Sequence, residues 1–121
     1  MEEKVVITGM GTINPIGNNV DETWENLKNG VSGVGSVTLF DAEDFKVRVA
    51  CEIKNFDPSI VLSAREIRRR DRFEQFASVA AQEAIFQAGI ELNGTLSERT
   101  GVIVSSAIGG LTALQDGSVS Y

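Results

Sequence analysis

The residues best suited to chemistry in this chain are a cluster of arginines near its middle. The cluster lies within an eight-residue window and consists of Arg65, Arg68, Arg69, Arg70 and Arg72. Only Glu66 and Asp71 oppose it there, so five arginines against two acids contribute +3 to a chain whose formal net charge is −6. Guanidinium groups bind carboxylates and phosphates well, so the cluster suits docking of an acidic or phosphorylated partner. The alternative is a solvated helix end whose arginines pair with neighbouring acids.

A second candidate site is the stretch SSAIGG at residues 105–110, where an apolar run gives way to small residues. Ligands in α/β folds bind at the carboxyl ends of strands, and Gly109 and Gly110 would let the backbone approach one closely. Ile108 is the large apolar side chain of this stretch. The alternative is an ordinary turn from a strand into a helix with Ile108 in the core, and the residue chemistry alone favours that alternative.

Two further features are weaker candidates for a functional site. The stretch GMGTINPIG at residues 9–17 begins like a dinucleotide fingerprint, but Asn14 occupies the third glycine position and Pro15 stands where a helix should open. Cys51 is the single cysteine, and the chain has no histidine to form a thiolate pair with it or to act as a base. We therefore expect Cys51 to be a buried apolar residue, and we predict no catalytic residue, metal ligand or cofactor site in this chain.

Composition excludes several classes of partner. A sequence pI near 4.6 argues against general nucleic-acid binding, which needs a broad basic surface. No stretch approaches the roughly 18 apolar residues of a membrane span, and the acidic start MEEKVV is unlike a secretory signal. A single cysteine fits a reducing compartment. We therefore expect a cytoplasmic protein with no membrane or nucleic-acid partner.

The arginine cluster opens the longest periodic segment of the chain. Ser63 and Glu66 have the spacing of a capping box, and Gly89 suits a helix end, which predicts one helix between them. Its apolar or small residues share one stripe: Phe73, Phe76, Ala77, Ala80, Ala81, Ala84, Ile85 and Ala88. Because most of them are alanine, the covering layer can come close.

The remaining elements fit an α/β domain. The β-branched runs at residues 5–8 and 101–106 predict two buried parallel strands joined by helical crossovers. A helix is predicted over residues 19–29, and another begins at Gly110. Alternation over residues 45–51 predicts a half-buried strand with Cys51 facing inward. At 121 residues we expect one domain with no internal boundary.

Four stretches together resemble the N-terminal region of the β-ketoacyl-[acyl carrier protein] synthases, especially the elongating enzymes. They are VVITGMGTINPIGN at 5–18, TWENLKNGVSGV at 23–34, RRRDRFEQFASVAAQEAI at 68–85 and RTGVIVSSAIGGL at 99–111. The resemblance implies a thiolase-like fold of αβαβα layers and a homodimer. The family's nucleophilic cysteine and two histidines are not matched here, so residues 1–121 would be the N-terminal part of a synthase whose catalytic residues lie downstream of Tyr121.

The resemblance also implies roles for both candidate sites. Arg65, Arg68 and Arg69 match basic residues that receive the acidic acyl carrier protein. Ile108 matches the residue that lines the acyl-chain pocket, beside Gly109 and Gly110. The implied reaction is the decarboxylative condensation of an acyl thioester with malonyl-[acyl carrier protein] in fatty acid biosynthesis, without a cofactor.

Three alternatives to that function stay open. A polyketide ketosynthase shares the same motifs, and a non-catalytic partner of the chain-length-factor type keeps the fold while lacking the cysteine. A stand-alone α/β binding module could act through the arginine cluster. The sequence that follows residue 121 separates these alternatives, because the enzyme requires a cysteine and histidines there.

Overall fold

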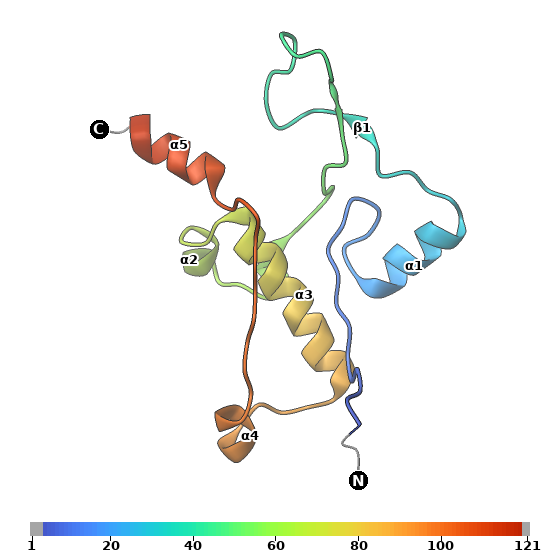
Figure 1. The fold of residues 1–121 in the computed structure, drawn as a ribbon, viewed down its shortest axis with the longest axis vertical. Helices are drawn as coiled ribbons and strands as arrows, with labels where there is room; N and C mark the ends of the chain where they lie inside the picture. Colours follow the sequence, from blue (N-terminus) through green and yellow to red (C-terminus); the bar gives the residue numbers. More distant parts are fainter. Residues whose placement is uncertain (1–3, 120–121) are drawn as a thin grey trace. The chain divides into compact units, whose positions relative to one another are not determined.

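The chain forms two compact units in a computed structural model that describes residues 4–119 (Figure 1). The first unit comprises Met1–Gly11 with Pro58–Tyr121, and the second comprises Thr12–Asp57. The sequence predicted no internal boundary. The boundary arises because residues 12–57 make most of their contacts among themselves, while the segments on either side of them pack on a shared helix.

The single helix predicted between Ser63 and Gly89 is two helices, α2 (Ala64–Ile67) and α3 (Arg72–Ala88). The capping box is confirmed, since the Ser63 N–H donates to Glu66 Oε2 at 2.9 Å and the Glu66 N–H donates to Ser63 Oγ at 3.4 Å. A second start follows at Asp71, whose N–H donates to Glu74 Oε2 at 2.8 Å. The D-x-x-E spacing that signals this start was present in the sequence and was missed.

The predicted apolar stripe of α3 makes a close contact at Ala80 and Ala84, but the expectation that the stripe is buried is wrong: its residues are half-buried, and Ala81 is exposed. A Cβ on Gly9 would collide with the Ala84 carbonyl oxygen, and a Cβ on Gly11 would collide with that of Ala80. The Met10 N–H lies between them and donates to Gln87 Oε1 at 2.6 Å. The N-terminal segment therefore lies directly against the helix backbone, which only glycine at alternate positions permits. Helix α3 ends at Gly89 with φ +63°, as predicted.

The two strongest predicted strands, residues 5–8 and 101–106, are extended but form no ladder among the described residues. Both segments run opposite to α3 and hence parallel to each other (Figure 1), which is the chain direction of a crossover unit. Their side chains are open to solvent, with Val5 98% and Ile103 97% exposed. The prediction of burial is wrong for this chain, because neither segment has a neighbouring strand in the described structure to share hydrogen bonds with.

The last helices of the first unit are α4 (Gly94–Glu98) and α5 (Leu111–Val119). Helix α5 begins after Gly110, as the sequence predicted. Helix α4 begins after Asn93, which has the extended conformation of an N-cap residue. A short 3₁₀ helix, η1 (Pro58–Ile60), packs against both α2 and α3.

The second unit contains helix α1 (Val20–Lys28) and a small antiparallel pair, β1 (Gly35–Ser36) and β2 (Val49–Ala50). Asn19 caps α1 by accepting the Glu22 N–H at 2.7 Å. Asn14 organises the preceding loop: its amide donates to Thr23 Oγ1 at 2.8 Å, and its side-chain carbonyl accepts the Ile16 N–H at 3.0 Å.

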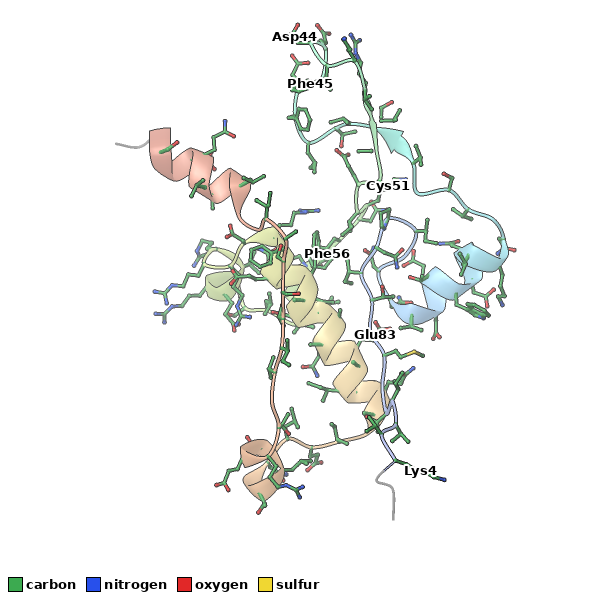
Figure 2. All side chains as sticks on the ribbon, viewed as in Figure 1. Lys4, Asp44, Phe45, Cys51, Phe56 and Glu83 are labelled. Atoms are coloured by element: carbon green, nitrogen blue, oxygen red, sulfur yellow. The ribbon has the colours of Figure 1, made fainter. Side chains whose placement is uncertain are left out.

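The strand predicted over residues 45–51 shrinks to the two residues of β2, and the prediction that Cys51 faces inward is wrong. Cys51 is exposed and follows β2 directly, while Phe45 lies near the tip of the loop between β1 and β2 (Figure 2). Alternation requires a covering layer on one face before it produces a buried side, and the described residues of this unit supply none.

Candidate functional site

The arginine cluster is an exposed cationic surface on and after α2, not a set of buried ion pairs. All five of its side chains are exposed. In the described part of the chain, Arg65, Arg68 and Arg69 form no ion pair or side-chain hydrogen bond. We call these three residues the free arginines.

The other two arginines are engaged within the protein. Arg70 pairs with Glu66 Oε1 at 3.2 Å and donates to Ser78 Oγ at 2.9 Å. The Arg72 guanidinium lies over the Phe76 ring, 5.2 Å from its centroid. The alternative of a neutralised helix end thus holds for part of the cluster only, and the free arginines remain available for a partner.

The negative charge of Glu66 is directed to Arg70 and not to the free arginines. Hydrogen bonds from the Ser63 backbone and hydroxyl lower the pKa of the Glu66 carboxyl below its ordinary value, and the nearby Arg70 lowers it further. Glu66 is therefore an anion at neutral pH, with its oxygens directed to Ser63 and Arg70. Its charge offsets Arg70 and leaves the free arginines as the net positive charge of the surface.

Two buried hydrophobic side chains lie in the region that carries this surface. Leu62, at the entry to α2, is 6% exposed, and Val79 of α3 is 5% exposed; they are the buried hydrophobic side chains of the described residues. Val79 lies outside the stripe that the sequence singled out, because η1 covers a second face of α3. We call the region formed by η1, α2 and the first two turns of α3 the helical corner.

The second candidate site, at residues 105–110, lies against the N-terminal end of α3. A Cβ on Gly109 would lie 2.5 Å from the Phe73 ring, and one on Gly110 would lie 2.5 Å from Asp71 Oδ2. Gly110 also has φ +73°, which side-chain-bearing residues rarely adopt. Both glycines are thus required where the chain turns past α3. Ile108 precedes them with 73% of its surface exposed.

A hollow of about 420 Å³ adjoins this turn, between α3 and the extended segment that leads to it. Phe73, Ala77 and Ala81 line it from the helix, and Val102 and Val104 line it from the extended segment. The lining is mainly apolar, with polar side chains from a few residues only. Those are Arg70, Glu74 and Ser78.

No catalytic group emerges from the described residues. They contain no cluster of three or more His, Cys, Asp or Glu side chains suited to a metal ion. Cys51 is exposed, in a chain without histidine. Among the described helices, none combines the length and apolar character needed to cross a membrane.

The comparisons with known proteins show the family. The family model described as "Beta-ketoacyl synthase, N-terminal domain" matches residues 2–120, so this chain belongs to the β-ketoacyl synthase family. A similar solved structure, "The ishigamide ketosynthase/chain length factor", aligns with a TM-score of 0.66 and 36% identity over 72% of this chain and 22% of that one. Family and structural likeness together support the predicted thiolase-like fold.

Curated relatives specify the resemblance further. The chain is 44% identical over 113 residues to "3-oxoacyl-[acyl-carrier-protein] synthase 2" of Staphylococcus aureus (strain N315), covering 93% of this chain. It is 44% identical over 110 residues to the protein of the same name from Coxiella burnetii, covering 91% of this chain. The chain spans 27% of the length of each of these relatives.

Proposed function

We propose that this chain is the N-terminal part of a β-ketoacyl-[acyl carrier protein] synthase of fatty acid biosynthesis. The observation that carries the proposal is the 44% identity, over 93% of the chain, to a protein named 3-oxoacyl-[acyl-carrier-protein] synthase 2. Two of the four stretches that carry the resemblance contain Arg68 and Arg69 and the SSAIGG segment at residues 105–110.

The reaction is a decarboxylative condensation that needs no cofactor. A cysteine thiolate takes an acyl group from its carrier thioester and releases the carrier thiol. Malonyl-[acyl carrier protein] then loses CO₂, and the resulting carbanion attacks the acyl-cysteine carbonyl, so that a carbon–carbon bond forms and the cysteine thiolate leaves. The cysteine and the two histidines that assist this step belong to the sequence beyond residue 121, and we expect residues 1–121 alone to be inactive.

In this proposal the free arginines receive the acyl carrier protein. They are exposed, lie close together along the chain and have no ion-pair partner in the described structure, which suits an acidic partner steered by charge. Arg65 lies on α2, and Arg68 and Arg69 lie directly after it; α2 packs against η1 in the helical corner, which supports a role that requires fixed positions.

Ile108, Gly109 and Gly110 form part of the acyl-chain pocket in this proposal. The two glycines keep the turn close to Phe73 and Asp71, while the exposed Ile108 side chain can meet a substrate or a further segment. A branched side chain at that place would limit the length of the acyl chain by filling space.

The uncovered apolar segments support a larger architecture. Val5, Ile7 and Ile103 are 98%, 84% and 97% exposed, which suits strands that join sheets completed by the rest of the protein. We therefore propose αβαβα layering, a homodimer and a cytoplasmic location for the whole synthase, as the family resemblance implies.

The decisive experiment uses the full-length protein and three charge reversals, Arg65→Glu, Arg68→Glu and Arg69→Glu. We expect KM for carrier-bound substrates to rise at least about tenfold, since three attractive charges become repulsive. KM for a small thioester such as an N-acetylcysteamine ester should stay unchanged. Equal changes for both substrates would remove the docking role, and turnover by residues 1–121 alone would remove the downstream assignment of the nucleophile.

The alternative function is a non-catalytic ketosynthase-like partner of the chain-length-factor type. The similar solved structure is named for both a ketosynthase and a chain length factor, and the curated relatives, which are named as synthases, favour the enzyme over this alternative. A polyketide ketosynthase is the other alternative. Condensation activity of the full-length protein with malonyl-[acyl carrier protein] distinguishes an enzyme from a silent partner.

A further inference from the structure

We infer that Gln75 is a positioning residue that orients α2 and thereby presets the geometry of the free arginines. This inference rests on the proposed docking function and assigns a role to a side chain outside the charged cluster. Gln75 lies in the first turns of α3, and the free arginines lie on or just after α2.

Helix α2 is too short to hold its own shape. It has four residues, and isolated helices of that length do not form in water. The Glu66 carbonyl accepts the Arg69 and Arg70 N–H groups, but the last carbonyl of the helix, that of Ile67, has no backbone donor in the described structure. A fixed α2 therefore requires hydrogen bonds or packing from other elements.

Gln75 supplies those hydrogen bonds. Its Nε2 group donates to the Ile67 carbonyl at 3.0 Å and to the Arg70 carbonyl at 2.8 Å. The two acceptors lie on either side of Arg68 and Arg69, so one amide group fixes both ends of the backbone segment that carries two of the free arginines. The contact with Ile67 is partly buried, which strengthens it relative to a surface contact.

A second link joins α2 to α3 through Arg70, which contacts Glu66 on one side and Ser78 on the other. The Arg70 and Glu66 side chains are 40% and 44% exposed, and exposed ion pairs contribute little. Gln75 is therefore the stronger of the two polar links. Leu62 and Val79 are buried in the helical corner, so we expect the corner to stay folded when either link is removed.

Presetting matters because three flexible arginines must meet one acidic partner. If α2 were loose, binding would have to order its backbone as well as the side chains, and affinity would fall. Gln75 reduces this cost without contacting the partner. Its loss should weaken carrier recognition while leaving the charge of the surface unchanged.

The test compares Gln75→Met with Gln82→Met in the full-length protein. Gln82 lies on the same helix, is exposed and makes no side-chain hydrogen bond in the described structure, so it is a matched control. For Gln75→Met we expect a several-fold to about tenfold higher KM for carrier-bound substrate, as the loss of one or two hydrogen bonds implies. The KM for a small thioester and kcat should not change, and Gln82→Met should match the wild type.

Two further measurements separate positioning from general damage. Backbone hydrogen exchange over residues 64–70 should become faster in Gln75→Met and stay unchanged in Gln82→Met. Added to the triple charge reversal, Gln75→Met should raise KM no further, because the arginines that it positions are gone. Should Gln75→Met fail to fold, Gln75→Asn replaces it, since the shortened amide cannot reach both carbonyls.

Each outcome is decisive. An unchanged KM for carrier-bound substrate, or an equal rise for both substrates, overturns the role of Gln75 while the docking function stands on the triple reversal. If the triple reversal itself fails to discriminate between substrates, the docking function falls, and the role of Gln75 falls with it.

Discussion

The helical corner and the two extended segments at residues 5–8 and 101–106 belong to the same compact unit and differ sharply. The corner holds Leu62 and Val79 at 6% and 5% exposure, and its backbone ends are capped by nearby side chains. The extended segments are richer in apolar residues, yet Val5 and Ile103 are 98% and 97% exposed. Apolar composition therefore does not decide which region is buried.

The difference lies in where each region finds its hydrogen-bond partners. A helix satisfies its backbone within itself and needs caps only at its ends, which Ser63, Glu66 and Glu74 provide from a few residues away. A strand needs a second strand, which can lie anywhere in the sequence. The corner is thus complete within the described residues, and the extended segments, under the proposed function, depend on partners from the rest of the synthase.

The substitution with the largest expected effect is Ile103→Asp, which tests whether the extended segment at residues 101–106 is buried in the full-length protein. In the full-length protein we expect a loss of about 4 kcal/mol of unfolding free energy, because under the proposed function the charge would replace an apolar side chain that a completed sheet would bury. In residues 1–121 alone, where Ile103 is 97% exposed, the change should be within about 0.5 kcal/mol. Urea titration of both proteins measures the difference, and equal effects would contradict the incomplete-sheet interpretation.

Gly11→Val tests a close contact between α3 and the chain that follows the extended segment at residues 5–8. A Cβ there would collide with the Ala80 carbonyl oxygen, so we expect a loss of about 3 kcal/mol in urea titration. Gly101→Ala is the control, because no atom lies within 4 Å of its added Cβ. A cost for Gly11→Val no larger than that of the control would show that the segment is free of α3.

Ile108→Phe tests the residue that lies between the extended segment at residues 101–106 and the turn against the helical corner. If Ile108 lines the acyl pocket, the larger ring should lower kcat/KM for long acyl primers about tenfold and leave short primers nearly unaffected. The measurement is the chain-length profile of the full-length protein. An unchanged profile would remove Ile108 from the pocket.

The smallest effect concerns the acid stability of the corner. Because hydrogen bonds from Ser63 hold the pKa of Glu66 below its ordinary 4.5, its stabilising contribution is present above that value and is lost as pH falls through the folded-state pKa. Glu66→Gln should therefore flatten the fall of Tm below about pH 4.5. Glu98→Gln, an exposed carboxylate with no side-chain hydrogen bond in the described structure, should leave the fall as it is.

Particular residues show how far prediction from sequence reaches here. The Ser63 cap and the Gly89 terminus were predicted correctly, since each depends on neighbours within a few residues. The break at Asp71 was also encoded locally and was missed. The buried strands over residues 5–8 and 101–106, and an inward Cys51, failed because they depend on a covering layer whose presence a local pattern does not record.

The sequence by itself determined the family, the helix caps and the position of the cationic cluster, because these follow from residue identity and short spacing. Only the tertiary structure decided that Arg70 and Arg72 are engaged while Arg65, Arg68 and Arg69 are free, that Gln75 holds the end of α2, and that Gly109 turns against Phe73. These arrangements require residues distant in the chain, or on separate helices, to meet. Such meetings are set by packing and chain direction, which short-range patterns do not encode.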